Sequence, residues 1–156
     1  MKQWHTREAS GIRLDREQRW WHDGEPVTHP RIIEAFNVGL KVEPDGRYKL
    51  EFGGDWCIVE VEAAAYRALV LDVSEGDRLS VRLSDRTAEL LDVGSLALEA
   101  EGVLTCAVKS GRARARFSRE AQFALGELFE RAGEGWALRV GARVEPLPPA
   151  VWPTGG

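Results

Sequence analysis

The chain has 156 residues, of which 44% are hydrophobic and 29% are charged, and its formal net charge is -4. This composition is typical of a globular protein that folds without disulfides or a structural metal, and it excludes collagen, coiled coil and intrinsic disorder. The mildly acidic balance argues against an extended nucleic-acid partner. No apolar stretch approaches the roughly 18 residues of a membrane span, so membrane insertion is not expected.

The chain opens with a predicted strand hairpin. Residues 12–15 alternate apolar and polar side chains, as a half-buried strand does. Residues 20–22 continue as an aromatic strand, and Asp23-Gly24 marks the turn that ends it.

A helix is predicted to begin at Pro30. Proline is tolerated at the first helical position, and it favours the extended geometry that His29 needs as an N-cap. The expected buried stripe of this helix has helical spacing and consists of Ile32, Ile33, Phe36 and Leu40. A hairpin over residues 48–52 and 56–61 follows, around Gly53-Gly54-Asp55, and then a strand at 69–73.

The second half of the chain is predicted to begin after a break at Glu75-Gly76-Asp77. Its expected strands are residues 79–83, 87–93, 104–108, 112–117 and 136–144. Ser118 is a typical N-cap for a second helix, whose buried stripe would run from Ala121 to Ala132, with Gly133 ending it. We therefore divide the chain into an N-terminal unit (1–74), a C-terminal unit (75–146) and an irregular tail (147–156).

The order of elements indicates an internal duplication. Hairpin, helix and strand occur once from Ile12 and again from Leu104. When His29 is aligned with Ser118, apolar positions match at three helical steps, pairing Ile32 with Ala121, Phe36 with Leu125 and Leu40 with Phe129. The fold class expected is α+β, built from two related units that meet at an interface, where pockets commonly form.

The two cysteines, Cys57 and Cys106, lie far apart in apolar runs and match neither a zinc motif nor a redox motif. We expect buried free thiols. The first five residues lead into charged sequence without the apolar core of a signal peptide, so a cytoplasmic, reducing location is expected.

The chain resembles a bacterial domain-of-unknown-function family, number 1285, over residues 20–37, where an aromatic–His–x–Gly stretch leads into Thr28-His29-Pro30. Asp45-Gly46-Arg47-Tyr48 and the strand at 55–61 also resemble that family. The resemblance implies two related α+β units, the second loosely like a pleckstrin-homology domain. It also implies a cleft between them that binds a nucleotide-like ligand, and a role in signalling.

Two histidines and a carboxylate, His22, Asp23 and His29, lie within eight residues. Their spacing is not the i, i+4 pair of a helical metal site and a turn intervenes, so no metal site is predicted. Histidine suits acid–base catalysis, but no serine or cysteine nucleophile motif accompanies these residues, so no catalytic residue is assigned.

Two features favour binding of an anion. Free N–H groups at the start of the first helix attract phosphate, and Arg31 in that turn would be relieved by an anion or by Glu34. Arg112, Arg114 and Arg116 alternate along one predicted strand and would project from one face as a phosphate clamp. Trp21 or its neighbour could stack a base.

The function expected is non-catalytic binding of a nucleotide-like anion between the units, in a regulatory or signalling role and without a cofactor. The predicted ligand-binding residues are Trp21, His22, Thr28, His29, Arg31, Arg112, Arg114 and Arg116. The arginines of the later unit are expected to face the start of the earlier unit's helix. Two alternatives stay open: a protein–protein interaction module without a small ligand, and a hydrolase using His22 or His29.

Overall fold

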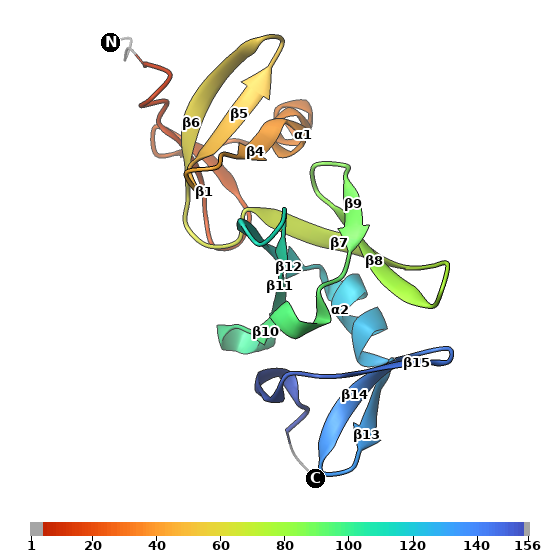
Figure 1. Cartoon of the computed structure of the whole chain (residues 1–156). Coiled ribbons are helices and arrows are strands. Elements are labelled where there is room, and N and C mark those ends of the chain that lie inside the picture. Colours follow the sequence, from red (N-terminus) through yellow and green to blue (C-terminus); the bar gives the residue numbers. More distant parts are fainter. Residues whose placement is uncertain (1–4, 155–156) are drawn as a thin grey trace.

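The structure is a computed structural model that describes residues 5–154, and within them three sheets follow one another from the N-terminal to the C-terminal end (Figure 1). Two sheets have six strands each and the third has three. No helix within the described residues combines the length and the apolar character needed to cross a membrane.

The first sheet holds the predicted N-terminal hairpins. Its strands in chain order are β1 (Ile12–Leu14), β2 (Trp20–His22), β3 (Glu25–Pro26), β4 (Leu40–Val42), β5 (Tyr48–Phe52) and β6 (Asp55–Val61). Helix α1 (Pro30–Gly39) lies between β3 and β4. Neighbouring strands are antiparallel except for β1 and β6, which pair in parallel.

Helix α1 begins and ends for local reasons. The Nδ1 atom of His29 accepts a hydrogen bond from the backbone N–H of Arg31 at 3.2 Å, which confirms the predicted N-cap. At the other end Gly39 allows close approach to β5, since a Cβ there would lie 2.5 Å from the Glu51 carbonyl oxygen. The predicted stripe is wrong at Ile32, whose side chain is exposed. The helix packs on the core through Ile33 and Phe36, and the Phe36 ring meets Trp20 edge to face.

The second sheet contains β7 (Tyr66–Ser74), β8 (Arg78–Leu83), β9 (Ala88–Leu90), β10 (Ala97–Leu98), β11 (Leu104–Val108) and β12 (Ala113–Phe117). Two short 3-10 helices, η1 (Val93–Ser95) and η2 (Ala100–Gly102), flank β10. Again all neighbours are antiparallel except one pair, β12 with β7.

The two six-stranded sheets repeat one topology. The first has the order β3-β2-β1-β6-β5-β4, and the second, taken from its far edge, has the order β9-β8-β7-β12-β11-β10. In each, two antiparallel three-stranded meanders join where the first strand of the unit pairs in parallel with the last. The predicted α+β class and duplication are therefore confirmed.

The predicted alignment of the repeats is wrong. The first repeat begins with β1 at Ile12, as predicted, but the second begins with β7 rather than at Leu104, and the place of α1 is taken in the second unit by η1. Aligning His29 with Ser118 failed because any two amphipathic helices share apolar spacing, whatever their place in a fold. The division at residue 74 stays a prediction, while the strand pairing puts β7 in the second sheet.

Helix α2 (Arg119–Gly126) follows the second sheet and is shorter than predicted. The Oγ of Ser118 accepts a hydrogen bond from the backbone N–H of Ala121, as expected for its N-cap. The predicted continuation to Ala132 is wrong because those residues form β13 (Phe129–Ala132) and pair with β14 (Gly135–Val140). Their apolar positions suit a strand as well as a helix.

The third sheet is completed by β15 (Arg143–Pro146), which pairs with β14. The single strand predicted over 136–144 is thus two strands, separated by a turn at Gly141, where φ is 56°. Beyond β15, Leu147 and Val151 are buried and η3 (Pro149–Val151) forms, so the segment predicted as an irregular tail packs on the core as far as Trp152.

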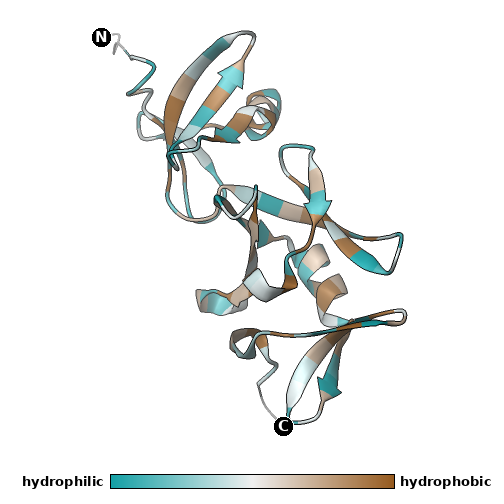
Figure 2. Cartoon of the chain, in the orientation of Figure 1, coloured by the Kyte–Doolittle hydropathy of each residue, from teal (hydrophilic) through white to brown (hydrophobic). Residues whose placement is uncertain are grey.

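One continuous apolar core runs through all three sheets. Its largest fully buried side chains include Trp20, Leu50, Tyr66 and Leu83. Figure 2 shows the brown and teal residues alternating along many of the strands, the pattern of sheets with one buried face. The core therefore fixes the two related units against each other, which sets the geometry of the space between them.

Candidate functional site

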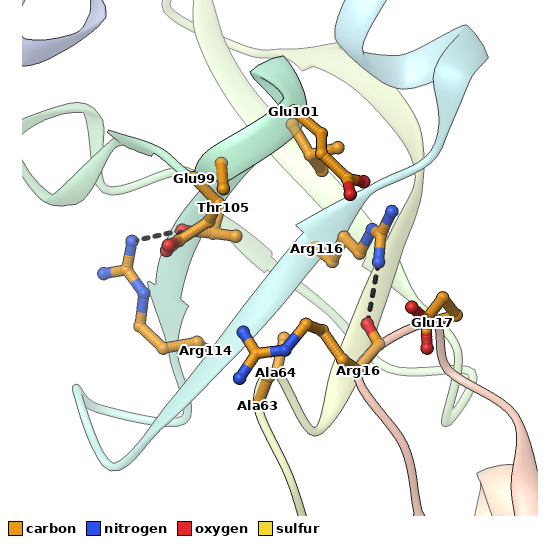
Figure 3. Close-up of a pocket in the computed structure, with 11 residues that line it drawn as sticks. Arg16, Glu17, Ala63, Ala64, Glu99, Glu101, Thr105, Arg114 and Arg116 are labelled. Atoms are coloured by element: carbon orange, nitrogen blue, oxygen red, sulfur yellow. Dashed lines mark hydrogen bonds between the residues drawn. The ribbon is translucent and has the colours of Figure 1, made fainter.

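A pocket of about 350 Å³ lies where the two related units meet (Figure 3). It is bounded by the loop after β1, the linker between β6 and β7, the η2 segment and the hairpin β11–β12. The lining residues are Arg16, Glu17, Ala63, Ala64, Glu99, Ala100, Glu101, Val103, Thr105, Arg114 and Arg116. This volume lies within the range of small-molecule sites.

Strand β12 supplies two arginines to the pocket by simple alternation. Ala113, Ala115 and Phe117 are buried on one face, so Arg114 and Arg116 project together from the other. The alternation predicted for Arg114 and Arg116 is confirmed. Arg112 precedes the strand, in an exposed turn where its backbone N–H bonds to the Lys109 carbonyl, and it does not line the pocket.

Each of the two guanidinium groups is held by a neutral acceptor. Arg114 Nη2 donates to Thr105 Oγ1 at 2.7 Å, and Arg116 Nη1 donates to the carbonyl oxygen of Arg16 at 2.7 Å. Within residues 5–154, no carboxylate oxygen lies within 4.0 Å of either group. Two cationic groups therefore face the pocket without an ion-pair partner.

Carboxylates form other parts of the wall. Glu99 accepts a hydrogen bond from Thr105 Oγ1 at 3.1 Å, and Glu17 and Glu101 also line the space. Three glutamates thus balance the three lining arginines in formal charge. The pocket offers N–H donors, carboxylate acceptors and an apolar section from the linker alanines, so it suits a ligand with groups of more than one kind.

The loop that carries Arg16 and Glu17 is shaped by Asp15. This buried carboxylate accepts hydrogen bonds from the backbone N–H groups of Glu17 and Arg19 and from Trp21 Nε1 at 2.8 Å. Burial works to raise the pKa of Asp15, but the hydrogen bonds from Trp21 and Arg19 outweigh it and the pKa is lowered. Trp21 therefore contributes to the pocket by fixing the loop through Asp15 and does not itself line the pocket.

The other predicted ligand-binding residues lie elsewhere. His22, Thr28 and His29 border a broad, open hollow on the first unit, which shares no lining residue with the pocket between the units. Arg31 is exposed and lines neither of these two spaces. The expected meeting of the later arginines with the start of the first helix is therefore wrong.

Glu34, which the sequence offers as a partner for Arg31, pairs with another residue. Glu34 pairs with Arg86 of the second unit at 2.8 Å, because α1 presents Glu34 toward the β8–β9 turn. The cation in the first turn of α1 is thus not compensated by Glu34.

Sequence reasoning missed most of the pocket wall, including Arg16, Ala64, Glu99 and Glu101. These residues lie in segments without a motif, and the two parallel strand pairs, β1 with β6 and β7 with β12, bring those segments together. One signal was present in the sequence: Thr105 is a lone hydroxyl in an otherwise apolar strand, and buried hydroxyls require a partner.

These features define an α+β protein of two duplicated six-stranded sheets with a charged pocket between them. No family model matches the sequence, and no curated protein matches it. Two solved structures share the fold. A DUF1285 family protein from Silicibacter pomeroyi DSS-3 is 23% identical, with a TM-score of 0.63 over 88% of this chain and 79% of that one.

The second is a DUF1285 family protein from Shewanella baltica OS155, 16% identical, with a TM-score of 0.55 over 76% of this chain and 91% of that one. The two structures confirm, at the level of the fold, the resemblance to this family. The likeness of the second unit to a pleckstrin-homology domain stays a prediction.

Proposed function

We propose that the protein is a non-catalytic module that binds a small nucleotide-like anion in the pocket between its two units and acts in regulation. One observation carries the proposal: Arg114 and Arg116 project side by side from β12 into the pocket and have no ion-pair partner among the described residues.

The anionic group would sit against these two guanidiniums. A guanidinium has about five N–H donors in a planar fork that matches the oxygens of a phosphate or carboxylate. Arg114 and Arg116 each use one donor on the neutral oxygen described above, so donors of each remain free for a ligand.

The glutamates narrow the class of ligand. Glu99 and Glu101 line the pocket together with the arginines (Figure 3). Carboxylates accept hydrogen bonds from hydroxyl or amino groups, and they repel a second negative charge. A ligand with one anionic end and a hydroxyl- or amino-bearing body fits this arrangement better than a bare polyanion.

Within residues 5–154, the pocket wall does not provide a ring on which a base could stack. Among the described residues, none that lines the pocket is aromatic. Trp21 donates its indole N–H to Asp15, and the Arg13 guanidinium carbon lies over the Trp21 ring, 5.2 Å from its centre. The base or other body of the ligand would contact Ala63, Ala64 and Val103 instead.

The two alternatives have less support. For a hydrolase, His29 uses Nδ1 as the cap of α1, and the hollow it shares with His22 contains no serine or cysteine among the described residues. For a protein-interaction module, the exposed large apolar side chains, such as Ile32, Val73 and Phe123, are distributed over several elements. Exposed apolar side chains are common on protein surfaces and do not by themselves mark an interface.

A thermal-shift panel tests the proposal. Nucleoside mono- and diphosphates, cyclic nucleotides, sugar phosphates and inorganic phosphate are added separately to the full chain. At 100 times its dissociation constant a ligand stabilises the fold by about 2.7 kcal/mol, which raises Tm by roughly 5–10 °C at this size.

The variants R114Q and R116Q should lose this shift, and R112Q is the matched control, because Arg112 lies outside the pocket. A flat panel, or an equal loss in R112Q, contradicts the proposal.

A further inference from the structure

Three side chains that commonly bind metals meet on the surface of the first unit, away from the pocket between the units. One ligand atom from each of His5, His22 and Asp23 lies within 4.8 Å of the other two. The spacing of His22, Asp23 and His29 does not predict a metal site, and the structure brings His5 to this cluster, from the segment before β1.

Both imidazoles approach the same carboxylate oxygen. His5 Nε2 lies 2.7 Å and His22 Nε2 lies 3.6 Å from Asp23 Oδ2. The two rings are tilted against each other with centroids 5.0 Å apart. Ligand atoms around a tetrahedral zinc ion are about 3.3 Å apart, so His22 is placed at a suitable separation and His5 has to move slightly outward.

The backbone positions the carboxylate independently of the histidines. Asp23 and Gly24 have φ of 50° and 80°, as in the tight turn that joins β2 to β3. The Asp23 N–H donates to the Gly11 carbonyl at 2.9 Å. A Cβ at Gly11 would lie 2.2 Å from Asp23 Oδ1, so glycine allows the carboxylate to rest on this segment.

We propose that His5, His22 and Asp23 form a binding site for a divalent transition-metal ion of the zinc type. Two imidazole nitrogens and one carboxylate oxygen suit Zn²⁺, whereas Ca²⁺ and Mg²⁺ require mainly oxygen ligands. Three protein ligands leave a fourth position of a tetrahedral ion for water or another molecule. The bound ion would also tie the segment that carries His5 to the β2–β3 turn.

The test is isothermal titration calorimetry of the untagged, metal-free full chain with zinc chloride. We expect one ion per chain. The variants H5A and H22A should each weaken zinc binding by at least about tenfold, since each lacks one of three ligands. Titration with magnesium or calcium chloride should give no comparable binding.

Two further variants keep the result interpretable. D23N removes the charge while asparagine still tolerates the left-handed turn, so zinc binding should fall with little change in Tm. H29N is the matched control, because it removes the remaining histidine and keeps an N-cap residue on α1. H29N should bind zinc as the parent does.

Three outcomes overturn the site: no zinc binding by the folded parent, equal affinity in the parent, H5A and H22A, or binding of magnesium as tight as that of zinc. The result does not depend on the anion pocket, which contains none of these residues. Failure of one proposal therefore leaves the other standing.

Discussion

Arg116 donates a hydrogen bond to the backbone carbonyl oxygen of Arg16 at 2.7 Å, although the two residues are 100 positions apart in the chain. The contact joins the last strand of the second unit to the first loop of the first unit at the wall of the pocket. Glu34 and Arg86 form a second link between the units at 2.8 Å. The pocket is therefore a product of how the duplicated units dock.

The link through Arg116 should contribute measurably to stability. R116Q removes the donor to the Arg16 carbonyl and should lower the free energy of unfolding by about 1 kcal/mol, as for a typical hydrogen bond. Urea denaturation followed by tryptophan fluorescence measures the change. R112Q, in an exposed turn, should leave the unfolding midpoint within error, and an equal loss in both variants would refute this role.

The ion pair between Lys109 and Asp85 should contribute more to the free energy of unfolding than the Arg116 hydrogen bond does. The Asp85 side chain is 1% exposed, and Lys109 Nζ lies 2.6 Å from its Oδ2 and 5.0 Å from the ring centre of Tyr66. K109M leaves a buried carboxylate without its cation and should cost about 3 kcal/mol, near the lower end for a broken buried pair.

Urea denaturation of K109M measures this cost. The matched control is K41M, on the exposed Lys41 of β4, which should change the free energy of unfolding by less than about 0.5 kcal/mol. If K109M were as stable as K41M, the pair would have no structural role.

Acid should destabilise the fold through two buried carboxylates. For Asp85, burial raises the pKa, but hydrogen bonds from Lys109 and Thr87 outweigh it, and the pKa lies below the ordinary value of 3.8. The pKa of Asp15 is also lowered: burial raises it, but the hydrogen bonds from Trp21 and Arg19 outweigh that effect. Below pH 5 the unfolded chain therefore binds more protons than the native one, and stability falls as pH falls through the folded-state values.

The measurement is the urea midpoint between pH 7 and pH 2, compared with D15N and D85N. Each variant should show a shallower loss in acid than the parent, after correction for its lower stability at pH 7. Stability that is constant or rising as pH falls below 4 would show that these carboxylates do not act in this way.

The two cysteines should differ in reactivity, although both are free. Burial raises the pKa of Cys106 to about 12, and its side chain is fully enclosed. Cys57 is half-buried, and its pKa is also raised, mainly by burial. With a disulfide reagent at pH 8, the native protein should react slowly at Cys57 and only after unfolding at Cys106.

The variant C57A isolates Cys106. We expect its native form to give no reaction over the time in which the parent reacts at Cys57, and one thiol per chain in urea. Rapid labelling of native C57A would mean that the second sheet opens readily.

N-cap residues and the alternation of apolar and polar side chains predicted the elements whose conformation depends on neighbouring residues in the chain. His29 and Ser118 cap helices as expected, and alternation identified β11 and β12 with their outward arginines. The end of α2 was missed because residues 128–132 suit both periodicities, and pairing with β14 decides between them. Local sequence patterns do not predict which strands will pair.

The same limit applies to the site. Arg114 and Arg116 were found because alternation is a local property, whereas the opposite wall depends on the parallel pairs β1–β6 and β7–β12. Those pairs join strands at the two ends of each unit. The anion-binding character of the helix start at His29 predicts that it lies near the arginines, but the structure places the loop of Arg16 there instead.

The most direct test of the anion pocket is a nitrogen-15 NMR titration of the full chain with adenosine monophosphate as the probe. We expect the amide signals of residues 16–17, 63–64, 99–105 and 114–116 to shift, and those of residues 28–31 to stay unchanged. Shifts confined to residues 28–31, or no shift anywhere at millimolar probe, would contradict it.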